Sequence, residues 1–204
     1  MNNYQKLFKQ EIASLKGRPA LLLHVCCGPC SVYPLKLLSR YFKITIYYAN
    51  SNIYPYEEYT KRLNELERYR KMLNNDIEIV IGSYDSDYQK YLSPFKDQKE
   101  GLDRCALCYM LRMKEAFAYA DKNAYDYFTT VMTISNHKNA DYINYIGTKL
   151  SEVYKHTRFL YADLKKDGGI DKNRQLNAKL DLYHQNYCGC IYSKQVSFQT
   201  KFRF

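Results

Sequence analysis

Short runs of apolar and β-branched residues alternate with longer amphipathic segments along this chain, and the alternation limits the fold more than any other sequence feature. The strand-like runs lie at residues 20–25, 43–49, 77–81, 127–132 and 157–161. The helix-like segments lie at residues 31–41, 55–73, 103–122 and 139–154. A helix between two strands carries the chain back to the edge of the sheet where the first strand began. The second strand then runs in the same direction as the first, so the two pair in parallel. The sequence therefore predicts an open, mostly parallel α/β sheet with helices on both faces.

Local features add detail to this prediction. Pro34 lies in the helix-like segment 31–41, where a proline is tolerated only in the first turn. Glu58 and Arg62 have the i,i+4 spacing of an ion pair, which we expect on a face of its helix away from the apolar stripe. Residues 93–101 and the segment from Asp163 onward are expected to be irregular.

The chain has 204 residues, the size of one domain, which we expect to span residues 1–204. Hydrophobic residues make up 46% of it, too many for a disordered protein. Its most apolar stretch, residues 20–27, is far shorter than the roughly 18 residues that a membrane span needs. The first 17 residues lack the apolar core of a signal peptide. We therefore expect a cytoplasmic protein with no membrane partner.

The chain is strongly basic, and its net charge of +10 favours a polyanionic partner such as nucleic acid. Residues 165–204 carry half of this charge, and no acidic residue occurs from Leu182 onward. Aromatic residues lie between the basic ones there, including a basic tail at about 194–204, and this composition suits stacked bases and neutralised phosphates. Alternatively, the aromatic rings pack this segment onto the domain while its lysines and arginines stay in solvent.

The seven cysteines fall into three motifs, at residues 26–30, 105–108 and 188–190. Without a secretory signal, grouped thiols are typical of metal or redox sites rather than of a disulfide scaffold. The first motif follows the first strand, at the sheet edge where α/β proteins bind ligands. The second places two thiols on one face of a helix. Four such thiolates suit either a zinc ion or an iron–sulfur cluster, and buried thiols without a ligand are the remaining alternative.

The third motif, Cys188-Gly189-Cys190, suggests redox chemistry. A disulfide across a single glycine is strained, and strained disulfides are the readily reduced ones. We therefore expect this pair to act as a dithiol/disulfide couple that can deliver two electrons. Ligation of a metal by both thiols is the alternative.

Four segments together resemble one known family, the cobalamin-independent epoxyqueuosine reductases (QueH family). They are LLLHVCCGPCS at 21–31, DRCALCYMLRM at 103–113, DLKKDGG at 163–169 and YCGCIYS at 187–193. The resemblance runs from about residue 18 to residue 194. It implies a Rossmann-like (HUP-type) sheet with a cysteine-containing helical segment and a basic, aromatic C-terminal segment. It also implies an oxidoreductase that reduces the epoxide of epoxyqueuosine to queuosine at the wobble position of tRNA, the final step of queuosine biosynthesis.

The resemblance also implies the cofactor and the roles of the cysteines. A [4Fe-4S] cluster would be ligated by Cys26, Cys27, Cys105 and Cys108. The redox-active disulfide would be Cys188–Cys190. Cys30 is a candidate ligand of a second, adjacent iron ion. The partner would be the anticodon loop of tRNA carrying epoxyqueuosine, with an unidentified electron donor. His184 departs from the pattern, because the family has an arginine there.

Removal of an epoxide oxygen takes two electrons and two protons and releases water, so a proton donor is needed at the oxygen. The candidate donors near the motifs are Asp163 and Lys165, with Asp103, Lys166 and His24. For each of them an ion pair, a helix cap, a solvated charge or a hydrogen-bonded core position is the alternative. Arg104 and Arg112 are expected to contact phosphates.

Two other functions fit parts of this sequence. The first is a thiouridine-forming or adenylating α/β enzyme that acts on tRNA. Such an enzyme needs a phosphate-binding loop such as SGGxDS after the first strand, whereas this chain has CCGPCS. The second is an RNA-binding module held together by zinc, for which the two C-x-x-C pairs would be the half-sites. Metal analysis separates the zinc module from the reductase, because the reductase would contain iron and sulfide and the module would contain zinc.

Overall fold

The computed structural model describes residues 3–73 and 77–195. Its sheet has five strands in the order β3-β2-β1-β4-β5, and every neighbouring pair is parallel. The strands are β1 (Ala20–His24), β2 (Lys43–Tyr48), β3 (Glu78–Ile81), β4 (Tyr127–Thr130) and β5 (Arg158–Phe159). The predicted parallel α/β sheet is therefore confirmed.

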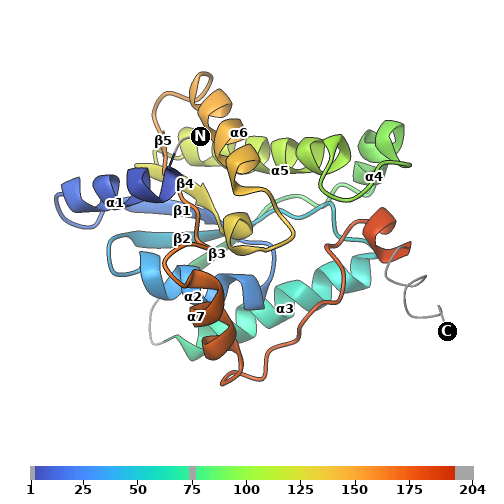
Figure 1. Cartoon of the computed structure of the whole chain (residues 1–204), viewed down its shortest axis with the longest axis horizontal. Helices are drawn as coiled ribbons and strands as arrows, with labels where there is room; N and C mark the ends of the chain where they lie inside the picture. The colour runs from blue at the N-terminus through green and yellow to red at the C-terminus, as the bar shows by residue number, and fades with distance from the viewer. Residues whose placement is uncertain (1–2, 74–76, 196–204) are drawn as a thin grey trace.

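Helices cover both faces of the sheet (Figure 1). Helices α5 and α6 lie on one face, and α2, α3 and α7 lie on the other. The helices are α1 (Tyr4–Ser14), α2 (Gly28–Leu38), α3 (Tyr56–Met72), α4 (Tyr88–Leu92), α5 (Asp103–Lys122), α6 (Ala140–Ser151) and α7 (Gly169–Asn177), with 3-10 turns η1 (Ser93–Phe95) and η2 (Val131–Ile134). None of these described helices is both long and apolar enough to cross a membrane.

Strand β1 divides the core into two layers because successive side chains of a strand point to opposite faces. Leu21 and Leu23 pack on the side of α2, whereas Leu22 packs on the side of α5. All three side chains are fully buried. Both faces of this central strand are therefore covered, which explains its uninterrupted apolar sequence.

Some local predictions were wrong. Helix α2 begins at Gly28, three residues before the predicted start, so Pro34 lies inside the helix rather than in its first turn. Pro29 occupies the first turn instead, where its missing N–H costs nothing. The segment after Asp163, expected to be irregular, contains α7. Because α7 follows Gly168, begins at Gly169 and has little apolar sequence, its pattern gave no helix signal.

Helix α7 fixes the start of α2. The side-chain amides of Asn173 and Asn177 both donate to the carbonyl of Pro29, at 3.1 and 3.0 Å. The side-chain oxygen of Asn173 accepts from the backbone N–H of Tyr33 at 3.0 Å. Since Pro29 lies between Cys27 and Cys30, α7 positions the turn that carries the first cysteine motif.

We expect Gly169→Ala to destabilise the fold by about 1–3 kcal/mol, the usual cost of overpacking a tight contact. A Cβ atom at Gly169 would lie 1.8 Å from the carbonyl oxygen of Leu164, so the backbone at the start of α7 must shift. Chemical denaturation of the purified protein measures the loss. The exposed Gln175→Ala on the same helix is the control, expected to stay within about 0.5 kcal/mol. Equal stability of the two variants would contradict the tight docking of α7.

Candidate active site at the carboxyl end of the sheet

A cavity of about 240 Å³ opens beside the carboxyl ends of β1 and β4, between which the strand order reverses. Open α/β sheets bind their ligands at this switch point because the loops there diverge. The loop after β1 supplies the first cysteine motif, and the loop after η2 supplies residues 135–138. The cavity, called the cysteine cavity below, is lined by Cys26, Cys30, Arg62, Glu100, Ser135, His137, Lys138, Gln185, Asn186, Tyr187 and Cys188.

The thiols of the first motif form a compact trio. The Sγ atoms of Cys26, Cys27 and Cys30 lie within 4.8 Å of one another, and within the described part of the chain this is the one metal-ligating group of three that compact. Cys27 and Cys30 also accept hydrogen bonds from the side-chain amide of Gln185, at 3.1 and 3.7 Å. Cys30 therefore belongs to the same sulfur group as the two adjacent cysteines, rather than standing apart from them.

The trio concentrates its negative charge on one sulfur. Hydrogen bonds from Cys27 and Cys30, helped by the charges of Lys138 and Arg112, lower the pKa of Cys26 well below the ordinary cysteine value. Burial and the neighbouring Cys26 raise the pKa of Cys27. The hydrogen bond to Cys26 raises the pKa of Cys30 to about 12. A thiolate is the form that ligates metals, so the trio fits a metal or iron–sulfur ligand.

The second motif lies in the first turns of α5. Cys105 and Cys108 are both buried, and the Sγ of Cys105 accepts from the backbone N–H of Gly101 at 3.2 Å. Burial raises the pKa of both thiols, that of Cys108 to about 12. Glu100, the residue before Gly101, lines the cysteine cavity. The predicted helical position of both thiols is confirmed, but neither lines the cavity or belongs to the compact trio of the first motif.

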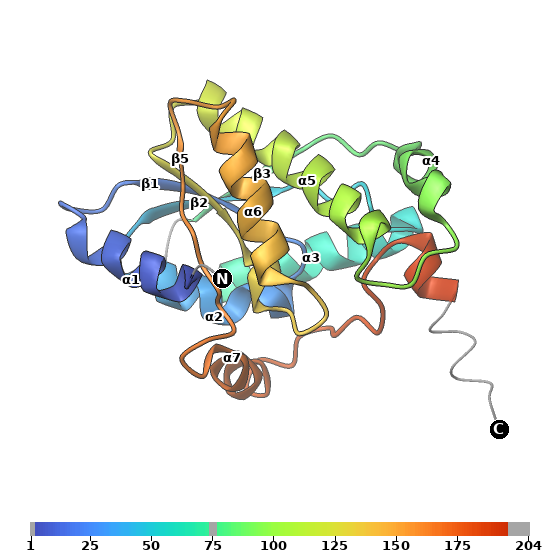
Figure 2. The ribbon, with the colours of Figure 1, turned by 45° about the horizontal axis from the view of Figure 1, so that its top comes forward.

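The third motif is brought to the same place by the last described segment, which passes α3 and ends beside α4 and α5 (Figure 2). Gly189 has φ +138°, a conformation that favours glycine, and its carbonyl accepts from the backbone N–H of Tyr54 at 2.8 Å. Cys188 lines the cavity, while Cys190 is buried and accepts from the backbone N–H of Ser193 at 3.4 Å. Both cysteines are free thiols in this structure.

Two cations lie among the three motifs. Burial would lower the pKa of Arg112, but Cys108, Cys26 and Cys188, which come from all three motifs, raise it above the ordinary arginine value. Cys188, Cys26 and Cys30 act on Lys138 in the same way. Burial would lower the pKa of Lys138, but these sulfurs outweigh burial and raise it above the ordinary lysine value. Cysteines of all three motifs therefore contribute to the electrostatic surroundings of these two cations.

The expected phosphate contacts of Arg112 and Arg104 are wrong. Arg112 is only 2% exposed, and its guanidinium donates to Asn50 and approaches His24. Arg104 is buried as well and donates to the carbonyls of Lys96 and Gln98. A guanidinium folded under the surface cannot reach a phosphate, so both side chains serve the interior.

His24 is the buried, hydrogen-bonded core residue that its strand position indicated. Its Nδ1 lies 2.8 Å from the hydroxyl of Thr130, and its Nε2 lies 3.3 Å from the carbonyl of Ala49. Burial, followed by the charge of Arg112, lowers the pKa of His24 to about 3. The imidazole is therefore neutral at physiological pH, and it connects β1 with β4 and β2.

The candidate proton donors Asp163 and Lys165 do not line the cysteine cavity. They form an ion pair with each other at 3.3 Å. The Nζ of Lys165 also donates to the carbonyls of Thr133 and Lys138, at 3.1 and 3.4 Å. Their catalytic role stays a prediction, and the contacts show that Lys165 supports the loop carrying Lys138. Asp103 and Lys166 lie outside this cavity as well.

The described aromatic residues of the C-terminal segment pack onto the domain. Tyr183 donates to the carboxylate of Glu58, and Tyr187 donates to the carbonyl of Tyr54 at 2.6 Å. Tyr192 donates to the carbonyl of Gln89 at 3.2 Å. His184 is exposed. Residues 196–204, which make up most of the predicted basic tail, lie outside the described residues.

Several cavity residues escaped the sequence interpretation, namely Arg62, Glu100, His137, Lys138 and Gln185. Lys138 and His137 follow the fourth strand, and residues after a strand of a parallel sheet are expected at the ligand edge. The sequence therefore did contain a signal for Lys138 and His137. Arg62 was expected on a face away from the apolar stripe of its helix, but it shares the buried face of α3 with Tyr59, Leu66 and Tyr69. Glu100 and Gln185 gave no signal.

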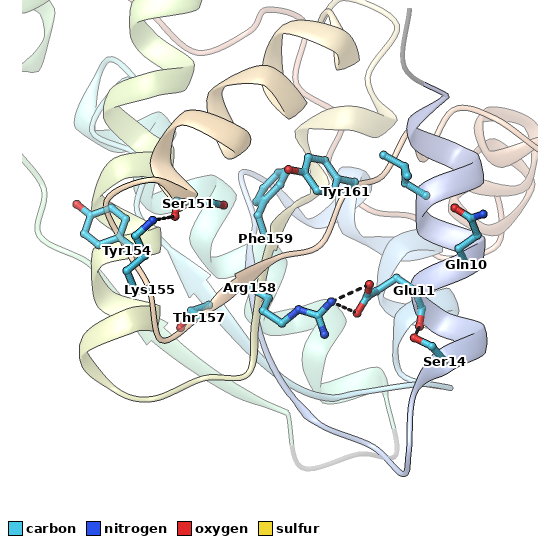
Figure 3. Close-up of a pocket in the computed structure, with 11 residues that line it drawn as sticks. Gln10, Glu11, Ser14, Ser151, Tyr154, Lys155, Thr157, Arg158, Phe159 and Tyr161 are labelled. Carbon is cyan, nitrogen blue, oxygen red and sulfur yellow. Dashed lines mark hydrogen bonds and ion pairs between the residues drawn. The ribbon is translucent and has the colours of Figure 1, made fainter.

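A larger pocket of about 580 Å³ lies between α1, the end of α6 and β5 (Figure 3). Arg158 and Glu11 both line this pocket and form a salt bridge of 2.9 Å, and they point toward each other in Figure 3. None of its lining residues belongs to a cysteine motif. Size alone therefore does not make it the active site.

The sequence and the fold both match known proteins. The family model described as epoxyqueuosine reductase QueH matches residues 21–196. The epoxyqueuosine reductase QueH of Streptococcus pyogenes serotype M1 is 35% identical over 184 residues, which cover 88% of this chain and 72% of that protein. The one of Staphylococcus aureus is 34% identical over 211 residues, which cover 97% and 88%.

A solved structure shares the fold. The U34-tRNA thiolase NcsA from Methanococcus maripaludis with its [4Fe-4S] cluster has a TM-score of 0.53 at 15% identity, covering 97% of this chain and 71% of its own. The family match spans most of the sequence and includes all three cysteine motifs of the site. This chain therefore belongs to the QueH family of epoxyqueuosine reductases, the oxidoreductases of the final step of queuosine biosynthesis.

Proposed function

We propose that this reductase acts on epoxyqueuosine at the wobble position of tRNA with a [4Fe-4S] cluster held by Cys26, Cys27, Cys105 and Cys108. The observation that carries the proposal is that Cys26 and Cys30 of the first motif and Cys188 of the third line one cavity, together with Glu100 of the loop that leads into α5 and its motif. Such a cluster supplies electrons one at a time. The sulfur trio supports a metal site on the chemistry of its donors, and the solved neighbour of the same fold contains a [4Fe-4S] cluster.

The third motif is proposed to hold the two electrons of one turnover. Oxidation of the Cys188 and Cys190 thiols to a disulfide releases two electrons and two protons. Reduction of an epoxide to an alkene consumes both, and the oxygen leaves as water. An external electron donor then reduces the disulfide again. The position of Cys188 on the cavity wall supports this role.

Two nitrogen-bearing side chains of the cavity have a proposed role at the substrate oxygen. Lys138 and His137 line it beside Cys30 and can face the oxygen as the C–O bond breaks. Glu100 is the one carboxyl group of the lining. Cys30 is proposed as a ligand of a second iron, because its Sγ lies within 4.8 Å of those of Cys26 and Cys27.

The tRNA is proposed to approach the mouth of this cavity. Tyr54 and Tyr56 are 41% and 56% exposed, and Tyr54 bonds directly to Gly189. Exposed tyrosine rings can stack on the splayed bases of an anticodon loop. The net charge of +10 supports binding of a polyanion.

Anaerobic purification followed by iron and sulfide counting tests the proposal, together with incubation of the protein with epoxyqueuosine-containing tRNA and a reductant. We expect the equal amounts of iron and sulfide that a [4Fe-4S] cluster requires, together with the additional iron proposed at Cys30, and conversion of epoxyqueuosine to queuosine in digested tRNA by mass spectrometry. The control is tRNA that already carries queuosine, which should remain unchanged. Zinc in place of iron, with no conversion, would favour the zinc-stabilised RNA-binding module instead.

A further inference from the structure

The backbone of the third cysteine motif is held by one buried side chain, Arg62 of α3. Its exposure is only 2%. Its Nη1 donates to the carbonyl of Cys188 at 3.0 Å, and its Nη2 donates to the carbonyl of Tyr187 at 3.1 Å. Its Nε donates to Glu58 at 2.7 Å. Each guanidinium nitrogen is therefore engaged, and two of the three hold the residues that enter the motif.

Neighbouring side chains hold these three hydrogen bonds of Arg62, called the Arg62 clamp below, in place. The hydroxyl of Tyr183 donates to the carboxylate of Glu58 at 3.1 and 3.2 Å, so the partner of Arg62 is itself fixed. A Cβ atom at Gly189 would lie 3.3 Å from Nη1 of Arg62 and 3.1 Å from the amide of Asn52. The motif can thus lie this close to α3 only because its central residue is glycine.

Arg62 also lines the cysteine cavity together with Cys188, Cys26 and Cys30. The Arg62 clamp therefore sets where the Cys188 sulfur lies relative to the first motif. Helix α3 packs against the sheet through Tyr59 and Leu66, so the helix that carries Arg62 is itself held firmly in the core. A dithiol that exchanges electrons must present its sulfur in a defined place, because a displacement of about 1 Å can cost a factor of about 100 in rate.

We propose that Arg62 is a positioning residue of the reductase, which fixes Cys188 at the wall of the cysteine cavity. The inference rests on the proposed redox role of Cys188 and Cys190. It assigns a function to the Glu58–Arg62 ion pair, which its i,i+4 spacing predicted to lie on the helix surface. Arg62 acts through the backbone of residues 187–188, to whose carbonyls both of its terminal nitrogens donate.

The test is Arg62→Lys in the iron-loaded protein. Lysine keeps the charge but offers a point donor instead of a planar fork, so it can hold at most one of the two carbonyls at this geometry. We expect an unchanged iron content and melting temperature, a kcat lower by about 100-fold, and faster alkylation of Cys188. Iodoacetamide labelling of the reduced protein, followed by mass spectrometry of the Cys188 peptide, measures this rate.

Arg68→Lys is the matched control, because Arg68 also lies on α3, pairs with Glu65 at 2.7 Å and donates to a distant carbonyl, that of Asp181. It should keep the wild-type kcat and alkylation rate. Glu58→Gln, which keeps the shape but removes the charge holding Arg62, should resemble Arg62→Lys. If Arg62→Lys and Glu58→Gln both keep wild-type alkylation and kcat, Arg62 serves the fold alone and the inference is overturned.

Equilibration of the wild-type protein with dithiothreitol redox buffers separates this inference from the proposed function. We expect Cys188 and Cys190 to titrate as one couple, with a midpoint shifted in Arg62→Lys. If the wild-type pair never forms a couple, the redox part of the proposed function fails. The alkylation rate of Cys188 then still decides whether Arg62 positions it.

Discussion

Replacing Cys26 or Cys105 with alanine is expected to remove the bound iron, the visible absorbance and all turnover. Each variant deletes one sulfur of the four proposed ligands, one from the loop after β1 and one from α5. Loss of even an outer-shell partner typically weakens metal binding about 10–100-fold, so loss of a direct ligand should exceed that range. Iron and sulfide counting on anaerobically purified protein measures the effect. Circular dichroism verifies that the variants are folded.

Cys30→Ala is the decisive comparison, because the Cys30 sulfur belongs to the same trio as those of Cys26 and Cys27. If Cys30 binds a second iron, its alanine variant should keep the cluster and its absorbance but lose the additional iron. A full cluster in Cys26→Ala together with its loss in Cys30→Ala would contradict the proposed ligands. It would establish a paired C-x-x-C site of Cys27, Cys30, Cys105 and Cys108 instead.

Replacing Cys188 or Cys190 with serine is expected to abolish turnover while the iron content stays at the wild-type value. Serine cannot form the disulfide, so the two electrons and two protons of one turnover have no source in the protein. The motif is attached through the backbone contacts of Gly189 to Tyr54 and of Cys188 to Arg62, which serine does not change. The fold should therefore persist. Product formation on modified tRNA and iron content are the two measurements.

Thiol counting before and after reductant completes this experiment. The wild-type protein should gain two thiols on reduction, and each serine variant should gain none. Ser193→Ala is a suitable control, because Ser193 contacts Cys190 through its hydroxyl at 3.4 Å but supplies no sulfur. Variants that lose iron in proportion to activity would make Cys188 and Cys190 metal ligands. Fully active serine variants would show that the electrons do not pass through this pair.

The sequence alone determined the order and direction of the five strands and of helices α2, α3, α5 and α6, because local periodicity indicates helix or strand. The predicted bounds of α5 agree with the structure, and all five predicted strands exist and pair in parallel. The positions of the cysteine motifs relative to the elements also followed from the sequence. A loop after β1 and one face of α5 were predictable sites for the first two motifs, since both depend on local geometry.

The tertiary structure decided which charged residues belong to the site. Arg62 and Glu58 have the spacing of a surface pair, yet their salt bridge is buried because residues 187–188, more than a hundred positions away, cover it. Arg112 was expected to reach a phosphate but lies beneath the sulfurs, where Asn50 and His24 hold it. Lys138 reaches the same sulfurs from the loop after η2. Which face of a helix is covered, and by which distant segment, depends on packing between elements, and no local pattern encodes that packing.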